Sequence, residues 1–145
     1  MLRAELSKGY EWVHITSHGW SLGWGLGNSN NVWIWVTGND IAGINPRTFF
    51  YNTHSCGNAL ITDRNYVAGT CLFSDYGLTY LGFTDTAYYP PEWDVIYSNN
   101  LRDKTFGETF KAIYDYVFQN APTGDSIPWM GTEMILLGDP TLRVN

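Results

Sequence analysis

The chain has 145 residues, of which 44% are hydrophobic, 17% aromatic and only 15% charged. A globular domain of this length buries about two-thirds of its unfolded surface, and the high aromatic and low charged content argue against a disordered chain. The net charge of −6 argues against the clustered basic surface of a nucleic-acid-binding protein, and no apolar run approaches the ~18 residues of a transmembrane helix.

The N-terminal part of the chain predicts extended segments separated by turns. Residues 11–17 are apolar and β-branched, which favours a buried strand that ends at a glycine turn. Glycine and asparagine are frequent in residues 20–31, a composition typical of a loop. A second apolar run occupies residues 32–36, a helical turn fits residues 37–44, and residues 48–54 form another predicted strand.

The C-terminal part alternates helices with strands. The sequence predicts a short helix within residues 63–74 and a strand over residues 78–84. Residues 134–144 form an apolar run, a turn and a short extended tail. Strands separated by helices and long loops indicate an α/β fold with a mainly parallel sheet, and the absence of an internal repeat or a low-complexity linker indicates a single domain over residues 1–145.

The clearest helical pattern covers residues 106–119, where large apolar side chains recur at a spacing of three or four residues. Thr105 and Glu108 have the spacing of a capping box, in which each side chain binds the backbone N–H of the other residue. Asparagine, proline and glycine within residues 120–124 are expected to end this helix.

Two chemically reactive side chains follow predicted strands. His18 follows the strand at 11–17, and Cys56 follows the strand at 48–54. Ligands of an open α/β sheet gather at the carboxyl ends of its strands, and parallel neighbours lie about 4.8 Å apart, so both side chains lie at one edge if these strands pair. An imidazole beside a thiol activates the thiol for attack on a carbonyl. The backbone N–H groups of Gly19 and Cys56 would then hold the oxyanion.

Other interpretations of the cysteines and histidines stay open. Cysteine is among the most buried residue types, and histidines at strand ends are often only hydrogen-bonded. Cys71 lies among apolar residues of a predicted helix, which favours a small core residue. His14 lies inside a strand, so its ring is expected to face a packed side of the sheet, whereas His54 shares a face with Cys56 but lies further from the strand end.

A zinc site and a sugar-binding surface are two further alternatives. The potential zinc ligands are His14, His18, His54 and Cys56. The spacing of the first two points both rings in one direction only on a helix, and their segment is a predicted strand, so we expect no metal site. Tryptophans offer apolar platforms to sugars, although core and loop packing also accounts for them. The tryptophans considered are Trp20, Trp24, Trp33, Trp35 and Trp93.

Several short motifs occur in the order seen in one peptidase family. An apolar strand ends in His18–Gly19, and a second apolar strand ends in Ser55–Cys56. Another apolar strand follows at 78–84, a helix opens at Gly107–Glu108, and residues 136–142 have the sequence Leu-Leu-Gly-Asp-Pro-Thr-Leu. With these motifs, which extend over most of its length, the chain resembles the gingipain-type cysteine peptidases of the caspase-like clan.

The resemblance implies a cysteine endopeptidase with a caspase-like three-layer sandwich fold. Cys56 would be the nucleophile, His18 the catalytic histidine, and the N–H groups of Gly19 and Cys56 the oxyanion hole. The implied reaction is peptide hydrolysis through an acyl-enzyme intermediate, without a cofactor. The loop at residues 85–93 would border the substrate pocket, with candidate walls at Tyr88, Tyr89 and Trp93.

The resemblance also implies an incomplete domain. The family has further strands before the strand that carries the histidine, whereas this chain has only about ten residues there. We therefore expect the C-terminal portion of a gingipain-like catalytic domain, truncated on its N-terminal side. Its open sheet edge would pair with the missing portion or with a second copy.

Partners and localisation follow from the same resemblance. Gingipain-like proteins are usually secreted, so we expect a secreted or cell-surface protein that acts on peptides or proteins, although residues 1–11 lack the apolar segment of a signal peptide. Neither a nucleic-acid partner nor a membrane span is expected. The alternative function is that of a non-catalytic, peptidase-like interaction module or a carbohydrate-binding module.

Overall fold

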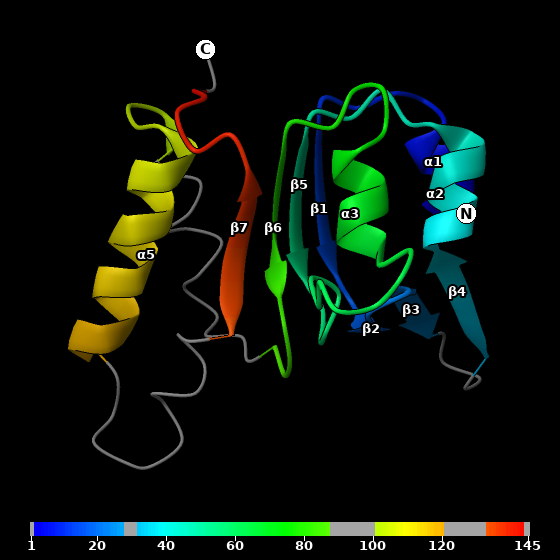
Figure 1. The fold of residues 1–145 in the computed structure, drawn as a ribbon, viewed down its shortest axis with the longest axis horizontal. Coiled ribbons are helices and arrows are strands. Elements are labelled where there is room, and N and C mark those ends of the chain that lie inside the picture. Colours follow the sequence, from blue (N-terminus) through cyan, green and yellow to red (C-terminus); the bar gives the residue numbers. More distant parts are fainter. Residues whose placement is uncertain (1, 28–31, 88–100, 121–132, 144–145) are drawn as a thin grey trace.

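The computed structural model of the protein describes residues 2–27, 32–87, 101–120 and 133–143. These residues form two sheets and several helices (Figure 1). In chain order, the elements are α1 (Leu2–Leu6), β1 (Trp12–Thr16), β2 (His18–Trp20), β3 (Gly23–Gly27), β4 (Trp33–Thr37), α2 (Gly38–Ile44), β5 (Phe50–His54), α3 (Val67–Leu72), β6 (Thr79–Phe83), α5 (Phe106–Asn120) and β7 (Met134–Gly138).

The larger sheet has four strands in the order β1-β5-β6-β7 (Figure 1). β1 pairs with β5 and β5 with β6 in parallel, whereas β7 runs antiparallel to β6. β1, β5 and β6 lie inside the ranges of the predicted strands, and β7 occupies the apolar run at the start of residues 134–144. The α/β fold with a mainly parallel sheet is therefore confirmed.

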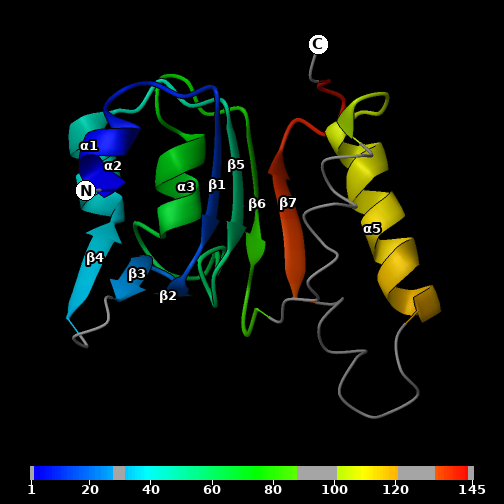
Figure 2. The same ribbon diagram turned by 180° about the vertical axis from the view of Figure 1, so that it is seen from behind.

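Helices lie on both sides of this sheet (Figure 2). Successive side chains of a strand point to opposite faces, so each face has its own buried cluster. On one face, Val13 and Ile15 of β1 pack in a cluster with residues of α2 and α3. On the other face, Leu81 and Phe83 of β6 pack with Phe106 of α5.

The capping box predicted before α5 is present. The N–H of Thr105 donates to Glu108 Oε2 (2.8 Å), and the N–H of Glu108 donates to Thr105 Oγ1 (3.1 Å). The bond from the Thr105 N–H holds the pKa of Glu108 below its usual value. The Phe106 ring stacks on Phe50 with ring centroids 4.6 Å apart, which attaches the start of α5 to the sheet.

Neither α5 nor any other helix of the described segments is long and apolar enough to cross a membrane.

The prediction of a loop over residues 20–31 is wrong for most of the residues in this range that the structure describes, 20–27. Trp20 ends β2 and residues 23–27 form β3, and these strands form an antiparallel three-stranded sheet with β4 in the order β2-β3-β4. Glycines suggested a loop, but alternate glycines of a strand lie on one face. Gly25 pairs with Trp35 and Gly27 with Trp33 in the β3–β4 ladder, so the glycines leave room for two indole rings.

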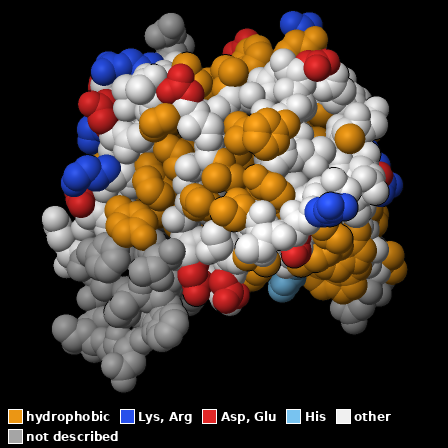
Figure 3. Space-filling view, viewed as in Figure 1, with side chains coloured by type: hydrophobic (Ala, Val, Ile, Leu, Met, Phe, Trp, Pro, Cys, Tyr) orange, Lys and Arg blue, Asp and Glu red, His pale blue; other side chains and the backbone are white. Residues whose placement is uncertain are grey.

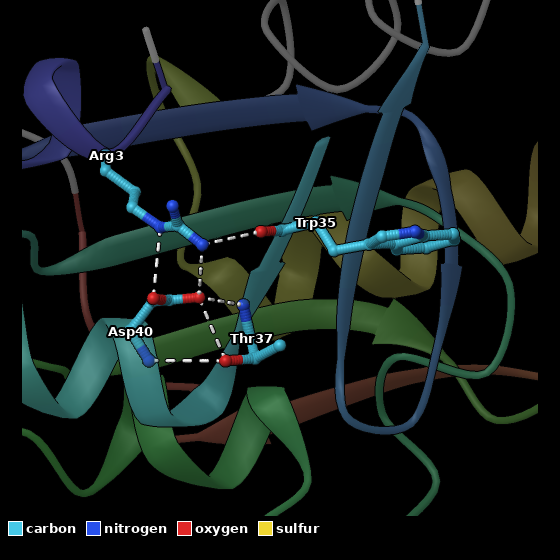
Figure 4. A network of polar contacts seen from close by, with 4 residues as sticks. All are labelled: Arg3, Trp35, Thr37 and Asp40. Carbon is cyan, nitrogen blue, oxygen red and sulfur yellow. Dashed lines mark hydrogen bonds and ion pairs between the residues drawn. The ribbon is translucent and has the colours of Figure 1, made fainter. Parts of the chain in front are cut away.

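A polar network joins this small sheet to α1 and α2 (Figure 4). The helical turn predicted at 37–44 is α2, which Thr37 caps: the N–H of Asp40 donates to Thr37 Oγ1 (3.3 Å), and the N–H of Thr37 donates to Asp40 Oδ2 (2.9 Å). The guanidinium of Arg3 donates to the Asp40 carboxylate (3.0 Å) and to the carbonyl oxygen of Trp35 (2.9 Å). The Thr37 N–H and the Arg3 guanidinium hold the pKa of Asp40 below its usual value.

Candidate active site

Parallel pairing of β1 with β5 determines where His18 and Cys56 lie. Thr16, the last residue of β1, is opposite His54, the last residue of β5. The pairing continues beyond both strands, because the N–H of Ser17 donates to the carbonyl oxygen of His54 (3.1 Å). The residues that follow the two strands therefore leave the same edge of the sheet side by side, as expected for parallel neighbours.

Gly19 lies directly against the segment that carries the cysteine. A Cβ atom at this position would overlap Ser55 Oγ and would lie 3.2 Å from the carbonyl oxygen of Cys56. Any side chain at position 19 would push β2 away from Ser55 and Cys56. Glycine has no side chain, so the backbone of β2 can lie this close to the candidate nucleophile. This close approach explains the glycine after His18.

Cys56 is partly exposed, and its sulfur is held by the backbone of a neighbouring loop. The N–H of Ala87 donates to Cys56 Sγ (3.4 Å), and the N–H of Gly57 donates to the carbonyl oxygen of Asp85 (2.6 Å). Gly57 has φ +60°, a left-handed conformation that favours glycine. The cysteine thus occupies a sharp turn that is tied to the segment after β6.

Asn58 fixes this turn from below, a role that the sequence did not indicate. Its Nδ2 donates to the carbonyl oxygen of Ser55 (2.6 Å), and its Oδ1 accepts from the N–H of Phe83 (3.3 Å). The side chain is fully buried, and Gly82 of β6 provides the space that it occupies. No local pattern could reveal this role, because Phe83 lies 25 residues away in sequence.

The imidazole of His18 is exposed on β2 and contacts an aromatic ring. Its centroid lies 5.0 Å from that of Trp33 in an edge-to-face arrangement. Within the described segments, His18 and Cys56 Sγ share no hydrogen bond. Position 19 of β2 points toward Ser55, so the neighbouring His18 side chain leaves the strand on the opposite face. The two residues lie at one edge of the larger sheet, and a catalytic contact between the imidazole and the sulfur would form only when substrate binds.

The other two histidines lie on the larger sheet. His14 is exposed, and its Nε2 lies 3.1 Å from Thr16 Oγ1, so the expectation that its ring faces a packed side is wrong. Its neighbours Val13 and Ile15 occupy the packed face instead, and at the edge strand the opposite face is open around His14. His54 is buried, and its ring centroid lies 5.4 Å from that of His14 and 5.8 Å from that of Phe83.

Cys71 is a core residue, as its apolar neighbours in sequence predicted. The side chain is fully buried in α3, and burial raises the pKa of its thiol well above the usual value. A buried thiol that resists ionisation is a poor nucleophile. Of the two cysteines, Cys56 is therefore the one that solvent and substrate can reach.

Two sets of candidate residues remain to be placed. The candidate pocket walls Tyr88, Tyr89 and Trp93 lie outside the described residues. Across residues 2–27, 32–87, 101–120 and 133–143, no group of three or more histidine, cysteine or acidic side chains is arranged to hold a metal ion.

Comparison of the sequence with family models and with curated proteins finds no match. Comparison of the fold finds a solved structure described as "Structure of Protease", with a TM-score of 0.75 and 14% sequence identity. The alignment covers 97% of this chain and 36% of that chain, so the chain spans about a third of the length of the protease. At this identity the similarity shows a shared, protease-like α/β fold.

Proposed function

We propose that the chain is the C-terminal portion of the catalytic domain of a gingipain-type cysteine endopeptidase, with the three-layer sandwich of the caspase-like clan. The observation that supports this best is the pairing of β1 with β5, which brings the His18–Gly19 segment against Ser55 and Cys56. The protease-like fold supports peptide hydrolysis as the reaction class.

In the proposed reaction, His18 takes the proton of the Cys56 thiol, and the sulfur forms a bond with the carbonyl carbon of the scissile peptide. The carbonyl electron pair moves onto oxygen, where the N–H groups of Gly19 and Cys56 stabilise the negative charge. The C–N bond then breaks as His18 returns its proton to the leaving amine. Water, deprotonated by His18, hydrolyses the thioester and restores the thiol.

The environment of Cys56 suits this role. The N–H of Ala87 holds the sulfur at the strand end, and Asn58 supports the turn beneath it through the Ser55 carbonyl. A nucleophile held in one orientation by buried neighbours loses less freedom when it reacts. Asn58 is thus a positioning residue, since it acts through the backbone of the turn.

Completion of the domain is part of the proposal. The chain spans 36% of the length of the solved protease structure, and β1 is an edge strand of the described sheet. We place the strands that the family has upstream at this edge, supplied by an N-terminal portion or by a second copy of the chain. A secreted or cell-surface location and a peptide or protein substrate belong to the same proposal.

A non-catalytic interaction module, or one that binds carbohydrate, is the second candidate. The observation in its favour is the exposure of Trp20, Trp33 and Trp35, which are 36%, 45% and 39% exposed. Exposed indole rings suit both sugars and apolar peptide side chains. In this case Cys56 and His18 would have no catalytic role.

Alkylation and hydrolysis together test the proposal. Limited iodoacetamide followed by mass mapping should modify Cys56 before Cys71, because Cys71 is fully buried. A library of peptides should be cleaved by the protein and not by Cys56→Ala, which should retain its fold. Earlier modification of Cys71, or full hydrolysis by Cys56→Ala, would contradict the assignment.

A further inference from the structure

Four aromatic rings occupy one face of the small sheet. Residues directly opposite each other in an antiparallel ladder share a face, as do residues two apart in one strand. His18 pairs with Gly25, which pairs in turn with Trp35. Trp20 and Trp33 lie two residues from His18 and from Trp35, so both share this face. We call the four side chains His18, Trp20, Trp33 and Trp35 the aromatic face.

The rings of the aromatic face form a continuous row. Trp33 contacts His18 with centroids 5.0 Å apart, and it stacks on Trp35 with centroids 6.0 Å apart and planes at 21°. Trp35 in turn contacts Trp20 edge to face, with centroids 4.2 Å apart. The row therefore leads from the candidate catalytic histidine outward along the sheet. Hydrophobic side chains gather over the small sheet at the lower right of Figure 3.

The rings are held in place from beneath. A Cβ atom on Gly25 would lie 2.5 Å from Cη2 of Trp35, and one on Gly27 would lie 3.2 Å from Cη2 of Trp33, so each indole lies over bare backbone. Arg3 anchors the carbonyl group of Trp35, while the indole extends away from that network (Figure 4). Rings fixed in this way lose little conformational entropy when a ligand covers them.

The contact with His18 indicates which ligand the row would take. In the proposed reaction His18 protonates the leaving amine, so the substrate residues that follow the scissile bond must pass beside this ring. An extended peptide advances about 3.3 Å per residue. Trp33 is therefore within reach of the first residue after the cut, because its ring centroid lies 5.0 Å from that of His18. The ring centroid of Trp35 lies 6.0 Å beyond that of Trp33, within reach of the residue that follows.

We propose that the aromatic face is the substrate subsite for apolar or aromatic side chains at the first and second positions after the scissile bond. This inference rests on the proposed peptidase function. The three indoles of the aromatic face offer apolar surface and ring contacts, and they carry no charge that could pair with a charged side chain. Acidic or small side chains at these positions would gain little from the face.

Kinetics with matched peptides test the subsite. Internally quenched substrates carry phenylalanine, leucine, alanine or aspartate at the two positions after the cut, on a common sequence before it. For the intact protein, kcat/KM should be highest with phenylalanine. In Trp33→Ala and Trp35→Ala, the ratio of kcat/KM between the phenylalanine and alanine substrates should fall roughly tenfold, the size expected for a lost ring contact with its buried area. Unchanged ratios in both variants would overturn the subsite.

Ile34→Ala is the matched control. Ile34 lies between the two tryptophans on β4, is 50% exposed, and points to the opposite face of the strand. Its ratio between the two substrates should equal that of the intact protein. An equal fall in Ile34→Ala would show that β4 matters only for the structure of the sheet, which would also overturn the subsite.

A binding experiment separates this inference from the peptidase proposal. Cys56→Ala is titrated with a phenylalanine-containing peptide, an alanine-containing peptide and soluble polysaccharides, with tryptophan fluorescence as the readout. Preferential binding of the phenylalanine peptide, lost in Cys56→Ala/Trp33→Ala, supports the subsite even if no peptide is ever cleaved, in which case only the peptidase function fails. Binding of polysaccharide without binding of peptide would overturn the subsite in favour of a carbohydrate surface.

Discussion

The two sheets of this protein use aromatic side chains differently. In the larger sheet, Tyr51 and Tyr80 are buried in the cluster with α2 and α3, their ring centroids lie 5.9 Å apart, and burial raises the pKa of both phenols. In the small sheet, Trp33 and Trp35 stack on each other but stay 45% and 39% exposed. The same class of residue thus fills a core in one sheet and forms a surface in the other.

The difference follows from what covers each sheet. Helices pack on both faces of the larger sheet, so its large side chains contribute to folding and its strand ends are the part available for chemistry. The aromatic face of the small sheet lies against glycines of its own strand β3. The larger sheet therefore positions the candidate active site, and the small sheet extends it with a contact surface.

The largest effect should come from removing the imidazole at the junction of the two sheets. We expect His18→Ala to lower kcat/KM for peptides by roughly 10²- to 10⁴-fold, the usual contribution of a general acid–base group. Because the ring is exposed, the free energy of unfolding should change by less than about 0.5 kcal/mol. Peptide kinetics and urea denaturation measure the two quantities. His14→Ala, on the exposed edge strand, is the control, and a loss of activity there with none in His18→Ala would reject the assignment.

A core substitution in the larger sheet should act on stability. Tyr80→Ala removes a fully buried ring, and we expect the free energy of unfolding to fall by about 3–5 kcal/mol. Phe73→Ala serves as the comparison, because that ring is 81% exposed and its loss should cost less than about 0.5 kcal/mol. Urea denaturation compares the two variants. Similar losses in both would contradict the division of roles between buried and exposed rings.

The contact between the two sheets should be sensitive to a single methyl group. Gly19→Ala would place a Cβ atom against Ser55 and the Cys56 carbonyl, so we expect a loss of about 1–3 kcal/mol of stability together with a loss of peptide hydrolysis. Gly43→Ala is a matched control in α2, where a Cβ meets nothing within 4 Å and should add about 0.5–1 kcal/mol. Thermal unfolding and peptide assays distinguish the two. Stabilisation by both would show that β2 does not lie against the cysteine turn.

The smallest effect should appear at the attachment of the small sheet to α1 and α2. The pKa of Asp40 is lowered in the folded protein, so its contribution is present above the unfolded value of about 3.9 and is lost as the pH falls below it. The unfolding free energy should fall more between pH 6 and pH 3 in the intact protein than in Asp40→Asn, by about 1 kcal/mol or less. Equal acid sensitivity in urea titrations would mean that this network does not stabilise the fold.

Local residue patterns were sufficient for much of the fold. Apolar, β-branched runs located β1, β5 and β6, and the spacing of Thr105 and Glu108 located the start of α5, because strand pleat and helix capping depend on residues only two to four positions apart. His18 and Cys56 were candidates on the same local basis, as reactive residues that follow predicted strands. Their catalytic roles stay predictions.

Contacts between distant segments decided the rest. The glycines of β3 indicate a loop when considered alone, and only their pairing with Trp33 and Trp35 makes them a strand. The exposure of His14, the burial of His54 and the support from Asn58 likewise depend on which strands are neighbours and where helices cover them. Pairing and burial depend on which strands and helices the fold brings together, and a local sequence pattern does not identify the partner of a strand. That is why the strand ends could be named in advance, whereas the row of tryptophans beside them emerged only in the folded chain.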